Sequence, residues 1–74
     1  MEQLKTIKEL INQGDVAEAI RQLDEYLITD STDRDEAFYL LGNAYRKQGD
    51  WQLALNNYQY AIDLNPDSPA REAY

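Results

Sequence analysis

The chain has 74 residues, which is near the lower end of what folds alone as one domain. Its 14 acidic and 7 basic residues give a net charge of −7, which disfavours nucleic acid and anionic membranes as partners. It contains neither Cys nor His, so it offers no disulfide, no thiolate zinc site and no histidine general base. We therefore expect no cofactor, no metal site and no enzyme.

Neither a secretory signal nor a membrane span is evident. The first 13 residues carry four charged side chains, so they lack the apolar core of a signal peptide. No apolar run approaches the roughly 20 residues that a transmembrane helix needs. The sequence favours a cytoplasmic protein, although a chain that had lost a signal would look the same.

Two helices are predicted in the first part of the chain. Residues 2–12 and 16–28 both carry apolar side chains at helical spacing, and the turn 13–15 separates them. Asp15 is the expected N-cap of the second helix, and Glu18 completes a capping-box pattern. The side chains expected to face inward are Leu4, Ile7, Leu10, Ile11, Val16, Ala19, Ile20, Leu23, Tyr26 and Leu27.

A short polar linker follows, with aspartates at positions 30, 33 and 35. A calcium loop of the EF-hand kind needs acidic residues at alternate positions followed by glycine, and this linker has neither the spacing nor the glycine. We interpret Asp33 or Thr32 as the N-cap of the next helix, with Glu36 as the capping-box partner of Asp33.

Residues 35–66 carry the clearest pattern in the chain. Two amphipathic helices fit this stretch, and the dipeptide Gly49-Asp50 marks a tight turn between them. Their predicted inner faces comprise Phe38, Leu41, Gly42 and Tyr45 on one helix, and Trp51, Ala54, Leu55, Tyr58, Ala61 and Ile62 on the other. Gly42 and Ala54 are the small residues on these faces, so we expect the two backbones to approach closely.

This pattern resembles the tetratricopeptide repeat, written W-x2-L-G-x2-Y…A-x3-F…P over about 34 residues. The matching residues are Phe38, Leu41, Gly42, Tyr45, Ala54, Tyr58 and Pro66, with Phe38 in place of Trp and Tyr58 in place of Phe. The resemblance implies an all-α fold in which antiparallel helix pairs stack as an α–α superhelix. It also implies an interaction scaffold that binds a protein or peptide rather than an enzyme.

Residues 1–34 read as a degenerate copy of this repeat, residues 35–68 as the repeat itself, and residues 69–74 as the start of a C-terminal capping helix. The turn Gln13-Gly14-Asp15 falls on Gln48-Gly49-Asp50 when the chain is shifted by 35 residues. Lys8 falls where Gly42 does, and Tyr26 falls where Ala61 does, so we expect different helix packing in the first copy.

The first helices of stacked repeats line the concave groove in this family. The resemblance therefore implies a peptide-binding stripe comprising Lys5, Glu9, Tyr39, Asn43, Arg46 and Lys47. Tyr39 offers a ring and a hydroxyl, Asn43 can hydrogen-bond an extended backbone, and Arg46 or Lys47 can meet a carboxylate. The alternative is an ordinary solvated helix face.

Some members of the family clamp a C-terminal carboxylate with Lys and Asn side chains. Lys5 matches the first Lys of that clamp, but Glu9 and Leu40 stand where its two Asn residues are expected. We therefore do not expect this specific clamp.

A second surface is predicted on the last long helix. Leu53, Tyr60 and Leu64 share one face, whereas the family usually has charged residues at the first two of these positions. The first copy has Glu18 and Glu25 there. An apolar group in such a place can mark a partner surface, so we predict a weak homodimer or the docking of a missing C-terminal helix. The alternative is that these side chains lie singly on the surface.

Overall fold

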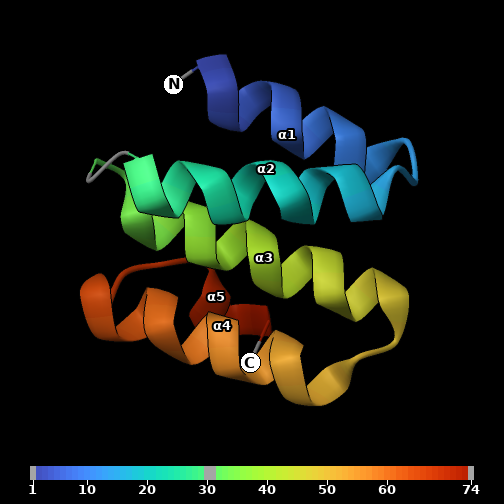
Figure 1. Ribbon diagram of the computed structural model, residues 1–74. Helices are drawn as coiled ribbons and strands as arrows, with labels where there is room; N and C mark the ends of the chain where they lie inside the picture. The colour runs from blue at the N-terminus through green and yellow to red at the C-terminus, as the bar shows by residue number, and fades with distance from the viewer. Residues whose placement is uncertain (1, 30–31, 74) are drawn as a thin grey trace.

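The computed structural model describes residues 2–29 and 32–73, and within them every regular element is an α-helix. The helices are α1 (Glu2–Asn12), α2 (Val16–Thr29), α3 (Arg34–Gln48), α4 (Trp51–Leu64) and α5 (Ala70–Ala73). Helices α1 to α4 lie in chain order, each antiparallel to the one before (Figure 1). This arrangement confirms the all-α prediction of stacked helix pairs. None of these helices is long and apolar enough to cross a bilayer.

The two turns inside the helix pairs have the same construction. Gly14 and Gly49 have φ angles of 88° and 83°, in the left-handed region that favours glycine at the end of a helix. The Gly14 N–H donates to the Ile11 carbonyl, and the Gly49 N–H to the Arg46 carbonyl, both at 3.0 Å. The repeated Gln-Gly-Asp sequence therefore closes both helix pairs in the same way.

The helix N-termini agree only partly with the predicted caps. The Asp50 carboxylate accepts a hydrogen bond from the Leu53 N–H at 3.3 Å, as an N-cap should. The Glu18 carboxylate instead accepts bonds from Arg21 at 2.6 Å and from Gln22 at 2.8 Å, so the capping box predicted with Asp15 is not formed.

The predicted capping box at the start of α3 is also wrong. Asp33 is the N-cap residue, but its φ of 52° is left-handed and its side chain makes no cap hydrogen bond. An N-cap side chain usually reaches the helix from an extended backbone, which Asp33 does not have. Asp30, the first aspartate of the calcium interpretation, lies outside the described residues.

The core has two parts joined by α3. The larger cluster contains Leu4, Ile7, Ile11, Ala19, Leu23, Tyr26, Ala37, Leu40, Leu41 and Ala44. The smaller one contains Ala54, Tyr58, Ala61 and Ala70. Phe38, Tyr39 and Tyr45 of α3 pack against both clusters. Helix α3 is therefore the shared wall between the first pair and the second.

Trp51 was predicted to face this core, and that prediction is wrong. Its side chain is 61% exposed. It is the first residue of α4, at the end of the helix, whereas Ala54 and Tyr58 one and two turns later are buried. Helical spacing places Trp51 on the flank of Leu55 and Ile62, both of which are half-buried.

Gly42 determines how closely α3 and α4 pack. A Cβ atom built on Gly42 would clash with Cδ1 and Cε1 of Tyr58 and lie 3.0 Å from its Cγ. Tyr58 is buried, so its ring has no free space to move into. The α3–α4 pair is the most closely packed in the molecule. Because glycine carries no side chain, the Tyr58 ring occupies the place that a Cβ would take.

The first helix pair makes less extensive contact than the second, where the sequence predicted only that the packing would differ. Lys8 takes the place of Gly42 and is exposed. Tyr26 takes the place of Ala61, is buried, and donates its hydroxyl hydrogen bond to the Thr32 carbonyl at 2.8 Å. This hydrogen bond ties α2 to the linker.

The short helix α5 is anchored by its first residues. The Ser68 hydroxyl accepts a hydrogen bond from the Ala70 N–H at 3.1 Å, so Ser68 is the N-cap of α5. Ala70 is buried against Ala54 and Ala61 of α4. Four residues are too few for a stable isolated helix, so α5 depends on this contact.

The Gly42 contact gives a prediction in which two effects have opposite signs. Helix propensity alone would make Gly42→Ala stabilising by about 1 kcal/mol. The clash with Tyr58 should outweigh it, because overpacking a core costs about 1–3 kcal/mol. We expect a lower melting temperature, by about 4–8 °C per kcal/mol, measured by circular dichroism.

The control for this prediction is the same change in a Tyr58→Leu background. With the ring removed, Gly42→Ala should become neutral or stabilising. A stabilising effect in the wild-type background would contradict the contact.

Candidate functional site

The predicted groove between α1 and α3 contains two hollows. The larger, of about 540 Å³, is the mixed-charge hollow, lined by Leu4, Lys5, Lys8, Asp33, Asp35 and Glu36. The smaller, of about 100 Å³, is the basic hollow, lined by Lys8, Ile11, Asn12, Leu40, Asn43, Arg46 and Lys47. Lys8 lines both, so the two hollows form one continuous surface.

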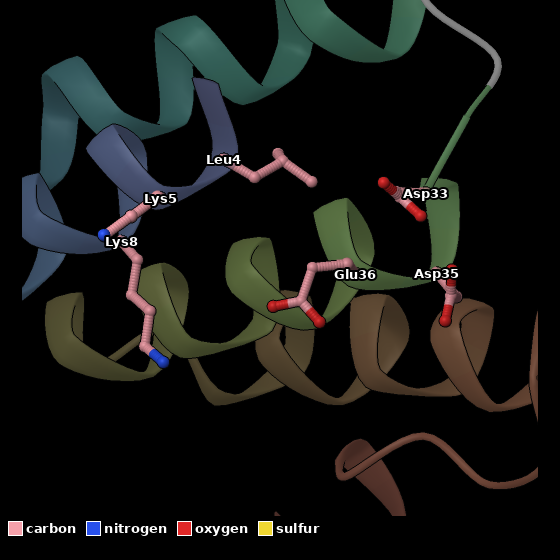
Figure 2. Close-up of a pocket in the computed structure, with 6 residues that line it drawn as sticks. All are labelled: Leu4, Lys5, Lys8, Asp33, Asp35 and Glu36. Carbon is pink, nitrogen blue, oxygen red and sulfur yellow. The ribbon is translucent and has the colours of Figure 1, made fainter. Parts of the chain in front are cut away.

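The mixed-charge hollow brings two lysines of α1 near three carboxylates at the start of α3. Figure 2 shows Lys5 and Lys8 extending from α1, with Asp33, Asp35 and Glu36 on the other side. Within residues 2–29 and 32–73, no ion pair shorter than 4.0 Å joins these two sides. The charges on the two sides of the hollow are therefore not neutralised by direct ion pairs with one another.

Glu36 is the carboxylate whose ionisation this hollow changes. Burial raises the pKa of Glu36, and the neighbouring charges of Asp35 and Asp33 raise it further, while Lys8 opposes them. Asp35 is held differently, because the Asn65 amide donates a hydrogen bond to it at 3.0 Å.

The basic hollow gathers cations at the other end of α3. Arg46 and Lys47 belong to the last turn of α3, and Lys8 faces them from α1. None of the three forms an ion pair within the described part of the chain. Three unpaired cations in a chain of net charge −7 make this hollow a favourable place for a carboxylate.

Asn43 is oriented by a hydrogen bond from the core. The Tyr58 hydroxyl donates to the Asn43 Oδ1 at 2.6 Å. Burial raises the pKa of Tyr58, although Arg46 opposes this effect, so the hydroxyl keeps its proton at neutral pH. Because the carbonyl oxygen is engaged, the Nδ2 group of Asn43 is the donor directed to a ligand.

The structure distributes the predicted stripe over several environments. Asn43, Arg46 and Lys47 line the basic hollow together, and Lys5 lines the mixed-charge hollow. Tyr39 is half-buried, with its ring centroid 6.1 Å from that of Tyr58. Glu9 is exposed and lines neither hollow. The peptide-binding role of these six residues stays a prediction.

Lys8 is the groove residue that the sequence analysis missed. Because Lys8 aligns with Gly42, the sequence predicted that it lies at the contact between α1 and α2. Its side chain instead lines both hollows. The signal was present, because a lysine at an inner position must reach solvent with its charged end.

The second predicted surface lies on α4. Leu53, Tyr60 and Leu64 are 39%, 52% and 54% exposed, and we call these three residues the α4 patch. None of them lines either hollow of the groove. The homodimer or docking role of this patch stays a prediction.

Comparison with known proteins identifies the repeat. The tetratricopeptide repeat family model matches residues 35–68, which contain α3 and α4. Residues 35–68 are a tetratricopeptide repeat. The match covers the half of the molecule that contains Gly42 and Tyr58, whose contact was described above.

Curated relatives include photosystem I assembly proteins Ycf3 of cyanobacteria. That of Synechococcus sp. (strain CC9902) is 41% identical over 61 residues, and that of Prochlorococcus marinus (strain MIT 9303) is 38% identical over 61 residues. Both matches cover 80% of this chain and 35% of the relative. The chain thus spans about a third of the length of these relatives.

A solved structure extends the comparison to the whole fold. The solution NMR structure of Bacteroides fragilis protein BF1650 is 68% identical to this chain, with a TM-score of 0.92. The match covers 99% of this chain and 74% of that protein. The arrangement of both helix pairs and α5 is therefore shared with a relative outside the cyanobacterial proteins.

The raised pKa of Glu36 gives a prediction on pH. A carboxyl group whose pKa is higher in the folded state favours folding when protonated, and this stability is lost as pH rises through the folded-state pKa. Glu36→Gln should therefore raise the melting temperature at pH 7, and the difference from wild type should shrink toward acidic pH.

Glu9→Gln is the matched control, because it removes one negative charge from an exposed site on α1. A thermal scan across pH in which both variants behave alike would contradict the role assigned to burial at Glu36.

Proposed function

We propose that this chain is a non-enzymatic protein-interaction module that binds an acidic peptide or protein segment in the groove between α1 and α3. The observation that carries the proposal is the basic hollow, where Lys8, Arg46 and Lys47 meet beside an oriented Asn43. We also propose that the protein works in the cytoplasm.

The proposed ligand is acidic because the basic hollow carries cationic side chains that form no ion pair within the described residues. A carboxylate brought to Arg46 and Lys47 would gain charge-assisted hydrogen bonds, which are stronger than neutral ones. The rest of the chain is acidic, so its long-range electrostatic attraction favours a basic ligand. Selection of an acidic ligand must therefore come from short-range pairing of its carboxylates with Arg46 and Lys47. An acidic segment therefore has a defined position in the groove rather than a diffuse attraction to the surface.

The donor on Asn43 defines the second contact. Its Nδ2 group can donate to a backbone carbonyl of an extended or helical segment while the Tyr58 hydroxyl holds Oδ1. Tyr39 lies on the same side of α3, and its half-buried ring offers an apolar contact beside these polar groups.

The relatives support an interaction role without naming a partner. The Ycf3 proteins are named for assembly of photosystem I, and that target belongs to them. This chain spans 35% of their length, so we transfer the general role of assisting protein assembly and not the photosystem.

The test begins with random peptides displayed on phage and selected on the immobilised chain. We expect the selected peptides to be enriched in Asp and Glu. Arg46→Glu with Lys47→Glu should weaken binding of a selected peptide about 10- to 100-fold in a fluorescence titration, because charged hydrogen bonds contribute about 1.5–3 kcal/mol.

The matched control is Arg21→Glu with Arg71→Glu, which changes the net charge equally at sites outside the groove. Equal losses in both double variants, or enrichment of basic peptides, would overturn the proposal.

A second prediction concerns the orientation of Asn43. Tyr58→Phe removes the hydroxyl that holds Asn43 and should weaken binding of the selected peptide, with a stability loss of about 0.5–1.5 kcal/mol. Tyr26→Phe removes another hydrogen-bonded hydroxyl from the core but does not touch the groove. Isothermal titration calorimetry should show weaker binding for the first variant alone. Equal affinities would show that Tyr58 does not position Asn43.

A further inference from the structure

The α4 patch is an apolar surface in a position where the first helix pair is charged. Leu53 and Tyr60 correspond to Glu18 and Glu25 of α2 under the 35-residue shift. Glu18 and Glu25 both pair with Arg21 on a solvated face. The same face on α4 has replaced charged side chains by large apolar ones, which water solvates poorly.

The patch borders a hollow of about 210 Å³. Its lining residues are Arg34, Phe38, Tyr60, Asp63 and Leu64. The Phe38 and Tyr60 rings meet at a centroid distance of 5.3 Å, and the Arg34 guanidinium lies 5.6 Å from the centre of the Phe38 ring. The floor of the hollow is therefore aromatic, with charged groups at its edge.

No described segment covers this surface. Helix α5 packs against α4 through Ala70, which shares a buried cluster with Ala54 and Ala61. Helical spacing places Ile62 and the α4 patch on opposite flanks of the buried face of α4. The cluster that contains Ala70 of α5 includes none of the three α4 patch residues.

The edge of the hollow carries one positive and one negative side chain, so the edges of two identical copies could pair with each other. Arg34 and Asp63 both line it, and neither takes part in an ion pair within residues 2–29 and 32–73. A two-fold axis through the hollow would bring Arg34 of one copy to Asp63 of the other, and the reverse pair would form at the same time.

We propose that a second copy of this chain occupies the α4 patch and its hollow. In this homodimer Leu53, Tyr60 and Leu64 of each copy are buried, and reciprocal Arg34–Asp63 pairs determine the register. Stable protein interfaces bury about 1,200–2,000 Å² in total, and one small patch on a 74-residue chain gives less. The dimer should therefore be weak and form at high concentration.

The dimer leaves both grooves open. Phe38 lies next to Tyr39 in sequence, so their side chains leave α3 about 100° apart, and Asn43 continues on the Tyr39 side. Two copies joined through their hollows would present two grooves facing outward, which makes the dimer bivalent. This consequence rests on the proposed function, whereas the dimer itself does not.

Sedimentation equilibrium over a range of concentrations tests the dimer. Wild type should associate at high concentration, and Leu53→Glu with Tyr60→Lys, which keeps the net charge, should stay monomeric. Trp51→Gln is the control, because Trp51 is a large exposed apolar side chain on the other flank of α4. It should associate as wild type does.

A charge-reversal experiment tests the register. Asp63→Arg alone and Arg34→Glu alone should each be monomeric, because like charges meet across the axis. An equimolar mixture of the two should associate, because opposite charges then meet at both contacts.

A wild-type chain that stays monomeric throughout overturns the dimer, as does association that survives Leu53→Glu with Tyr60→Lys. A mixture that fails to associate overturns the register.

Arg34 also donates to the Leu27 carbonyl at 2.9 Å, so the melting temperature of each variant is measured alongside. If Arg34→Glu fails to fold, Asp63→Arg still decides the register, since unchanged association of that variant overturns it. Peptide binding by the monomeric variants separates the dimer from the groove, because their grooves are intact.

Discussion

The contact between Gly42 and Tyr58 is the constraint on which the second repeat depends. Because glycine leaves room for the ring, α4 approaches α3 closely enough to bury Ala54 and Ala61 between them. This close approach also brings the Tyr58 hydroxyl into hydrogen-bonding distance of Asn43, which lines the groove. Because Gly42 has no side chain, it determines both the packing of the core and the direction of the Asn43 Nδ2 donor in the groove.

The first helix pair lacks this contact. Lys8 takes the position of the glycine, α1 and α2 make less extensive contact, and the lysine contributes its charge to both hollows of the groove. Tyr26 replaces the second small residue and bonds to the linker instead of the groove. The first helix pair therefore supplies the groove with a cation that a glycine at this position could not provide.

Much of the fold was predictable because the determining residues act locally. The Gln-Gly-Asp turns depend on neighbours within a turn or two, and the structure confirms them. The predicted inner face of α3 is confirmed for Leu41 and Gly42, but it missed Ala37, Leu40 and Ala44, which are buried against the first helix pair. The exposure of Trp51 depends on which segment covers the start of α4, which the pattern on α4 does not contain. The predicted capping hydrogen bond of Asp33 is not formed, because the Asp33 backbone is left-handed at the start of α3. In the groove, Asn43, Arg46 and Lys47 follow from helical spacing, whereas the raised pKa of Glu36 depends on burial between two helices.

The central claim is that the groove between α1 and α3 binds an acidic segment while the Gly42–Tyr58 contact holds its wall in place. Nuclear magnetic resonance of the isotopically labelled chain, titrated with a peptide selected on it, tests this claim most directly. We expect the shifts to concentrate on Lys8, Asn43 and Arg46, including the Asn43 side-chain amide, while contacts between Gly42 and the Tyr58 ring persist. Shifts confined to α4 or α5, with an unchanged Asn43 amide, would contradict it.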